Sequence, residues 1–329
     1  MKRLALLLAL AAPAFGQVKP DSTLERVVVT ATRTAAALED VAVPITVVGA
    51  DEIEADGALR LGDVLDALPG LEVTSGLGGV GIQIQGLDPA YTLILIDGQP
   101  VVGRTAGVLD VSRLSTTGIE RVEVVRGPSS SLYGSDALAG VVNLVTAVPR
   151  EPAVRLRART GSFAQSALAL EAEGGTQLLG RAWGARLALD RTATDGYDLD
   201  PDLFGNTTPE RTETTADLRV SGELGPQTRA RLGVRATTGD DRLRYAFADV
   251  NDAVFPINET GARRDWSVHP ELRHTWGGRY ALRLQGYATG YRLDTQVFET
   301  DRGGGDSLTY DDRFDQRQLK AEAQVDALW

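Results

Sequence analysis

The sequence predicts an α+β domain followed by the antiparallel strands of a transmembrane β-barrel. Within residues 45–150, helix-type and strand-type hydrophobic patterns succeed one another at short intervals. From about residue 153 the pattern changes to long runs in which apolar and polar residues alternate. Such alternation is typical of strands with one apolar and one polar face. A secretion signal at the N-terminus agrees with a protein that reaches a membrane outside the cytoplasm.

Residues 1–16 have the features of a signal peptide. Lys2 and Arg3 supply the positive region, residues 4–12 form a short apolar core, and small residues up to Gly16 suit cleavage before Gln17. The apolar run is far shorter than the ~20 residues that a membrane-spanning helix needs. We therefore expect an exported chain without a helical anchor.

Composition excludes several classes of function. The chain has no cysteine and a formal net charge of −11. It therefore cannot be a disulfide scaffold or a Cys-ligated metal protein, and it lacks the basic stripe of a nucleic-acid surface. Its two histidines, His269 and His274, do not have the spacing of a zinc site on a helix. We predict no metal and no cofactor.

The segment 17–44 is polar and carries one β-prone run, residues 25–31. It offers too little apolar surface to pack alone, so we expect it to be flexible. A short β-prone segment in a flexible tail is suited to adding itself as a strand to the sheet edge of a partner. The same run also fits an ordinary first strand.

The α+β domain at 45–150 has recognisable elements. We expect a helical turn at 51–56 and a helix at 59–68 that stops at Pro69-Gly70. Ile82 and Ile84 alternate with polar residues, which indicates a strand. Residues 92–96 form a continuous apolar strand, and Asp97-Gly98 signals a hairpin turn.

The second part, 151–329, reads as about eight strands with polar links. In each regular run an apolar face opposes a face rich in Arg and acidic residues, which a narrow soluble barrel would have to bury. Trp266 and Trp276 share one parity, and on a strand tilted by ~40° their separation of roughly 25 Å along the membrane normal fits two aromatic girdles. Pro270 between them is awkward for a strand with two neighbours. The runs lie at 153–160, 166–174, 181–190, 216–224, 229–237, 264–276, 279–291 and 318–329.

Three motifs invite a different interpretation. Residues 76–81 satisfy G-x-G-x-x-G, but a strand follows instead of the helix that a dinucleotide site requires. The serines at 129–131 have no adjacent base, so we predict that the protein is not an enzyme. The carboxylates of the loop 195–202 suit either calcium binding or simple solvation. They are Asp195, Asp198, Asp200 and Asp202.

Four segments in order resemble the motifs of TonB-dependent outer-membrane receptors of the siderophore, haem or cobalamin type. ERVVVTATRT at 25–34 resembles the TonB box, the segment that pairs with the periplasmic protein TonB. LGDVLDALPGLEV at 61–73, LILIDGQPV at 93–101 and IERVEVVRGPSSSLYGSDALAGVVNLVT at 119–146 resemble successive motifs of the plug, the domain that fills the barrel. The resemblance covers 25–150 closely and 151–329 as barrel-like strands.

The resemblance implies residue roles. TonB would bind Glu25, Arg26, Val27, Val28, Val29, Thr30 and Ala31. Two plug loops would form an outward apex that touches the ligand. These apex residues are Leu87, Asp88, Pro89, Ala90 and Tyr91, and Val102, Gly103, Arg104, Thr105, Ala106 and Gly107. Arg126 would contact the barrel, whereas Gln85 stands where many members carry a second arginine.

The family barrel has 22 strands, which need about 220 residues at ~10 residues each. Only 179 residues follow position 150. We therefore expect an incomplete barrel in the N-terminal part of a longer receptor. The function implied is active uptake of an iron-siderophore, haem or cobalamin by a monomer in the outer membrane, in contact with its lipid and with no nucleic-acid partner. The alternatives are a surface binding protein or phage or bacteriocin receptor without transport, and a soluble exported enzyme.

Overall fold

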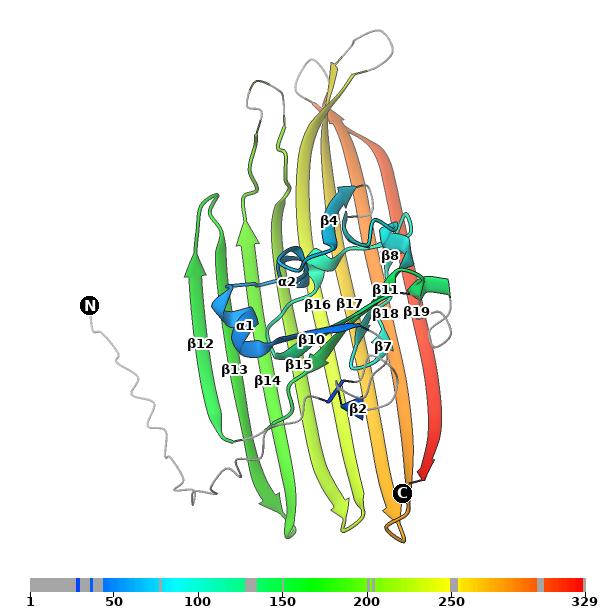
Figure 1. Ribbon diagram of the computed structural model, residues 1–329. Helices are drawn as coiled ribbons and strands as arrows, with labels where there is room; N and C mark the ends of the chain where they lie inside the picture. The colour runs from blue at the N-terminus through cyan, green and yellow to red at the C-terminus, as the bar shows by residue number, and fades with distance from the viewer. Residues whose placement is uncertain are drawn as a thin grey trace, which may run out of the picture.

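The computed structural model describes residues 28–29, 36–37, 44–76, 79–127, 135–149, 151–199, 202, 205–248, 254–300 and 305–327. Two parts are joined in sequence: an N-terminal domain at 44–149, and one large antiparallel sheet that we call the wall (Figure 1). The expected signal at 1–16 lies outside the described residues. The described part of the chain has no helix with the length and apolar character needed to span a membrane.

The wall has eight strands, and each pairs antiparallel with the next along the chain. All eight predicted strands are confirmed, although most are longer than their alternating core. The strands are β12 (Ala153–Thr160), β13 (Ser166–Leu178), β14 (Arg181–Thr194), β15 (Glu210–Gly225), β16 (Thr228–Ala248), β17 (Val254–Trp276), β18 (Tyr280–Thr300) and β19 (Asp306–Ala327).

The two faces of the wall differ as the alternation predicts. Asp217 and Arg235 are buried toward the N-terminal domain, whereas Leu218 and Leu232 point away and are 40% exposed. Trp266 is also exposed on that outer face. An exposed apolar face opposite a charged, covered one is the arrangement of barrel strands that meet lipid on one side.

Pro270 is accommodated by a glycine. On one side Pro270 stands opposite Leu232 in the register of β16 and β17. On the other side the register with β18 skips His269 and Pro270, and Gly286 lies there. A Cβ on Gly286 would come within 3.0 Å of the proline ring, so the glycine leaves room for it. This placement allows a proline inside a paired strand.

The two ends of the wall are unlike. At one end, short turns join the strands, such as Leu179-Gly180 and 277–279. At the other end the links are longer, such as 195–209 between β14 and β15. Outer-membrane barrels have short turns on the periplasmic side and longer loops outside. In Figure 1 the hairpin strand β8 (Arg104–Thr105) lies toward the long links, and β2 (Ala36–Ala37) lies nearer the short turns.

The N-terminal domain is built on a five-stranded sheet of order β3-β10-β11-β6-β7, in which β11 and β6 are parallel. Helices α1 (Ala50–Ala55) and α2 (Leu61–Asp66) confirm both predicted helical segments. The sheet strands are β3 (Ile45–Gly49), β10 (Ile119–Arg126), β11 (Gly140–Thr146), β6 (Thr92–Ile96) and β7 (Gln99–Pro100). Two hairpins, β4 (Leu71–Gly76) with β5 (Gly79–Ile84) and β8 with β9 (Val108–Leu109), complete the domain.

The domain has its own hydrophobic core. Leu61 and Leu65 of α2 are fully buried against Val122 and Leu144 of the sheet. The predicted turn at Asp97-Gly98 is confirmed, and both residues have positive φ, 51° and 75°. These angles give the tight two-residue turn whose twist matches antiparallel strands. The apolar packing lies inside the domain, so its contact with the wall must use other forces.

Replacing Leu65 by Ala should lower the free energy of unfolding of the N-terminal domain by about 2–5 kcal/mol, because the cavity cannot collapse around a fully buried site. Hydrogen–deuterium exchange of the β10 and β11 amides would measure the loss. The matched control is Leu68→Ala, since Leu68 packs at the margin of the same core and is partly exposed. Equal exchange rates in the two variants would contradict a core centred on α2.

Candidate functional site

The first predicted apex loop, 87–91, is a short capped turn. The Ala90 amide donates to Asp88 Oδ1 at 2.8 Å, and this bond caps the 3-10 helix η2 (Pro89–Tyr91). The side chains of Leu87 and Tyr91 are 43% and 44% exposed. An apolar and an aromatic side chain are therefore accessible from outside on a backbone that is held in place by the cap.

The second predicted apex loop, 102–107, contains strand β8 and the turn that joins it to β9. Its turn residues Ala106 and Gly107 both have positive φ, 48° and 83°. Two left-handed residues in succession make the tight turn that closes such a hairpin. Ala106 and Gly107 are exposed, whereas Val102 and Gly103 are buried. The loop thus presents a tip and is fixed at its base.

Arg104 joins the two apex loops. Its Nη1 donates to the carbonyl oxygens of Ala90 at 3.1 Å and Gly107 at 3.0 Å, and its Nη2 donates to that of Thr92 at 2.9 Å. Burial lowers the pKa of Arg104, and the charge of Asp136 opposes this shift. A guanidinium stays protonated in proteins, so the bridge is charged. The structure therefore brings the two predicted loops into one surface.

Asp110 is the most connected carboxylate between the N-terminal domain and the wall. Its side chain accepts from the Val80 amide at 3.2 Å and from the Ser112 amide at 3.0 Å. It also pairs with Arg263 of β17 at 3.0 Å and with Arg211 of β15 at 4.0 Å. Burial alone would raise the pKa of Asp110, but the two guanidinium groups and the hydrogen bonds prevail and lower it.

Further ion pairs cross the same seam between domain and wall. Within the described residues, these pairs involve several wall strands. In some pairs the arginine belongs to the domain, and in others it belongs to the wall. They are Arg60–Asp190 at 3.5 Å, Arg113–Asp265 at 3.2 Å, Asp97–Arg219 at 2.8 Å and Glu54–Arg157 at 3.1 Å. Arg126 ends β10, where its amide donates to Pro44 O at 3.3 Å, and its predicted contact with the barrel stays a prediction.

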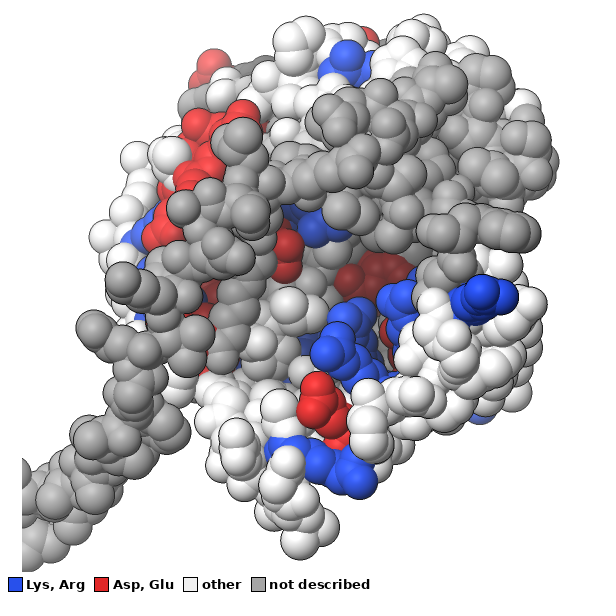
Figure 2. Space-filling view, turned by 60° about the horizontal axis from the view of Figure 1, so that its bottom comes forward, with Lys and Arg blue, Asp and Glu red and all other residues white. Residues whose placement is uncertain are grey.

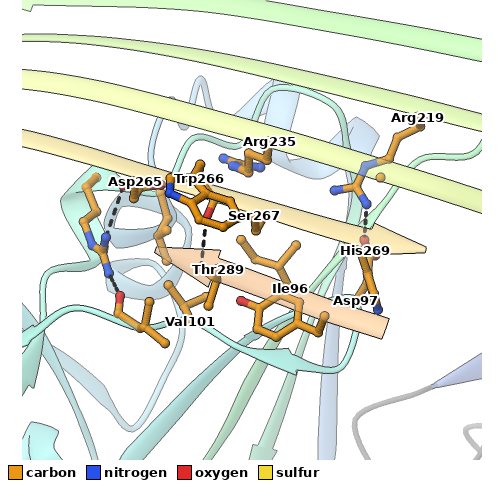
Figure 3. A pocket seen from close by; sticks show the side chains of 15 residues that line it. Ile96, Asp97, Val101, Arg219, Arg235, Asp265, Trp266, Ser267, His269 and Thr289 are labelled. Atoms are coloured by element: carbon orange, nitrogen blue, oxygen red, sulfur yellow. Dashed lines mark hydrogen bonds and ion pairs between the residues drawn. The ribbon is translucent and has the colours of Figure 1, made fainter. Parts of the chain in front are cut away.

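A small cavity lies in this seam. It measures about 30 Å³, which is enough to hold a water molecule. Figure 3 shows Asp97 and Arg219 joined by an ion pair on one side of it, and Asp265 on the other side. Val102 is the apex residue that lines it.

A second cavity of about 320 Å³ lies between α1 and strands β12 to β14. Seen from the end that carries the short turns, the molecule shows a hollow with side chains of both charges (Figure 2).

The remaining predicted sites are placed as follows. Of the proposed TonB-binding run, Val28 and Val29 are described, and they pair with Ala37 and Ala36. The other residues of that run lie outside the described part.

His274 contacts Thr228 Oγ1 at 2.8 Å through Nδ1, and the ring of His269 packs edge-on against Tyr287. No group of three His, Asp or Glu that could hold a metal ion occurs among the described residues.

In the loop 195–202, Thr207 Oγ1 donates to Asp198 at 3.4 Å. Asp200 lies outside the described residues. Calcium binding and solvation therefore both stay predictions for this loop. The sequence alone did not predict the ion pairs of the seam. Alternation of charged residues along a strand predicts on which face of the sheet a side chain lies, but it does not predict which residue of the other domain it contacts.

A separately folded domain seated through ion pairs on long antiparallel strands has the architecture of a plug and its barrel wall. Residues 37–141 match the family model described as TonB-dependent Receptor Plug Domain. The N-terminal domain is therefore a plug of the TonB-dependent receptor family, followed by strands of the corresponding barrel. The chain is accordingly placed in the cell outer membrane.

Known proteins agree with this assignment. The chain is 35% identical over 210 residues to "Vitamin B12 transporter BtuB" of Photobacterium profundum, a match that covers 62% of this chain and 34% of the transporter. The ferripyoverdine receptor of the outer membrane of Pseudomonas aeruginosa has a similar fold, with a TM-score of 0.62 at 14% identity over 91% of this chain and 51% of that one. The siderophore receptor PirA from Acinetobacter baumannii has a TM-score of 0.51 at 15% identity, over 86% and 54%. The chain thus spans about a third of the curated relative and about half of these structures.

Replacing Asp110 by Asn should loosen the plug from the wall at neutral pH by about 1–3 kcal/mol, because two arginines lose their shared anion. The native pKa of Asp110 lies below its unfolded value, so its contribution is present above about pH 4 and is lost as the pH falls through the native pKa. Exchange of the Val80 and Ser112 amides should therefore be faster in the variant at pH 7, and the difference should vanish at low pH.

The control for this experiment is Asp88→Asn, since Asp88 caps an exposed turn. It should leave the Val80 amide unchanged at every pH. A difference between Asp110→Asn and the parent that persists unchanged at acid pH would show that the charge of Asp110 is not what holds the plug.

Proposed function

We propose that the protein takes up a scarce ligand across the outer membrane by TonB-dependent active transport. The observation that carries the proposal is a plug of the matched family, seated on barrel strands through ion pairs. Ion pairs can be exchanged for water, whereas the plug keeps its own apolar core. Such a plug can shift within the barrel without unfolding, and transport through a plugged barrel needs this property.

The proposed ligand classes are cobalamin, iron-siderophore and haem. The cobalamin class is supported by the sequence relative, whose name is that of a vitamin B12 transporter. The siderophore class is supported by the fold neighbours, which are named as siderophore receptors. We propose that the ligand contacts Leu87, Tyr91 and the tip of the second apex loop, where exposed side chains stand on a backbone fixed by Arg104.

We propose TonB as the periplasmic partner, bound by strand addition at residues 25–31. Uptake changes no covalent bond, so the protein acts as a transporter and not as an enzyme. Outer-membrane lipid would meet the exposed apolar face of the wall, at residues such as Leu156 and Leu168. One protomer carries both plug and wall, so we propose that it works as a monomer.

Deleting residues 25–31 should abolish uptake and leave ligand binding unchanged, because the segment is remote from the apex loops in sequence and serves only the energised step. The measurement is accumulation of radiolabelled cyanocobalamin or iron-59 pyoverdine in cells, with binding to isolated outer membranes measured in parallel. A matched control replaces the same seven residues with a Gly-Ser segment of equal length, which keeps the tail length and removes the β-prone pattern.

Binding without uptake in both variants supports the proposed transport. Uptake that continues in either variant would instead favour the alternative of a surface binding protein that does not draw on TonB. Loss of binding together with uptake would indicate that the tail is needed for folding, and it would contradict the separation of roles proposed for the tail and the apex.

A further inference from the structure

Arg113 connects the second apex loop to the wall. It ends the 3-10 helix η3 (Val111–Arg113), and its side chain is only 2% exposed. On the plug side, Nη2 donates to the carbonyl oxygens of Val102 and Gly103 at the base of the loop. On the wall side, Nη1 forms an ion pair with Asp265 of β17 at 3.2 Å. One guanidinium therefore touches both bodies.

Tyr291 of β18 completes this contact. The Cζ atom of Arg113 lies 4.5 Å from the centre of the Tyr291 ring, within the range of a cation–π interaction. The same ring lies against Gly103, where an added Cβ would overlap the ring atoms. Gly103 also has φ of +92°, and its amide donates to Gln316 Oε1 of β19 at 2.9 Å. The base of the loop is thus fitted to three wall strands.

The two arginines of this region have different tasks. Arg104 binds the second apex loop to the first, and all its bonds lie within the plug. Arg113 binds the same loop to the wall. A planar guanidinium with five donors suits such a position, because it can serve a carboxylate, two carbonyl groups and an aromatic face at once.

We propose that Arg113 is a positioning residue for ligand binding, which clamps the apex loop 102–107 to the wall through Asp265 and Tyr291. The inference rests on the proposed function, because it assumes that the loop contacts the ligand. The clamp makes the ligand-facing surface depend on the wall as well as on the plug. Releasing the Arg113–Asp265 pair frees the loop while the plug core stays folded.

The clamp can be tested without any ligand. The chain has no cysteine, so a nitroxide on Ala106→Cys, at the exposed tip of the loop, reports its mobility alone. In the full-length protein in outer-membrane vesicles, we expect a restricted spectrum for the parent and a mobile one for Arg113→Gln. Arg113→Lys should give an intermediate spectrum, since it keeps the charge but cannot bind both carbonyls and the carboxylate in one plane.

Two variants of the wall residue Tyr291 test the clamp without changing any further residue of the plug, so that misfolding of the plug cannot account for their effect. Tyr291→Leu removes the aromatic face and should mobilise the label. Tyr291→Phe keeps the ring and loses only the hydroxyl that bonds to Thr105 of the loop, so its spectrum should stay closer to that of the parent. The affinity for cyanocobalamin and for ferric pyoverdine is then measured on the same vesicles. If the held position is populated a tenth of the time, the affinity of whichever probe binds the parent should fall about tenfold in Arg113→Gln and Tyr291→Leu.

The outcomes separate the clamp from the proposed function. A spectrum of Arg113→Gln that matches the parent would overturn the clamp. A mobile loop with unchanged affinity would overturn its positioning role in ligand binding. If neither probe binds the parent, cobalamin and pyoverdine are excluded as ligands, and the spectra alone then decide whether Arg113 holds the loop. Mobility and affinity that change together, with Tyr291→Phe closer to the parent than Tyr291→Leu, support the inference.

Discussion

The whole arrangement depends on how the plug is held: by buried charge pairs across a seam and not by a shared apolar core. Asp110 with Arg263, Asp97 with Arg219, and Arg113 with Asp265 are its main bonds. A buried charge is costly unless its partner is in place, so these pairs favour one seated position over all near alternatives. The same pairs lose less than an apolar interface would when water enters the seam. Specific seating and reversible release therefore follow from one kind of interaction.

The seam accounts for some of the arginines of the chain. All but three of its 34 basic residues are arginines, the lysines being Lys2, Lys19 and Lys320. Arginines at the seam often serve a backbone carbonyl as well as, or in place of, a carboxylate: Arg235 donates to Ser115 O and Arg159 to Gly57 O. A lysine, with one compact charge, matches such forked sites poorly. At the seam, arginine therefore suits the task of joining a folded domain to strands through its loops and carbonyl groups.

The sequence predicted the elements better than their partners. The helix at α2, the strand at 92–96 and the Asp97-Gly98 turn follow from local patterns, and β12 has the expected bounds. Wall strands such as β17 extend well beyond the alternating core, because strand pairing continues through polar residues that carry no apolar periodicity. The seam pairs could not be foreseen, since their partners stand 122 to 153 residues apart in the chain. No local pattern encodes a contact at that separation.

A loop that binds ligand must meet two opposing demands, and its base shows how both are satisfied. A stiff loop keeps its affinity, whereas transport requires that the plug can later move. At Gly103 the backbone lies against the ring of Tyr291, where any side chain would collide with the ring. This close fit fixes the shape of the contact, but it does not by itself attach the loop to the wall. The holding force comes from Arg113, whose contacts are polar and can be replaced by water one at a time. The close fit thus sets the position of the loop, and the polar contacts of Arg113 both hold it there and allow its release, so the same few residues can serve both stages of a transport cycle.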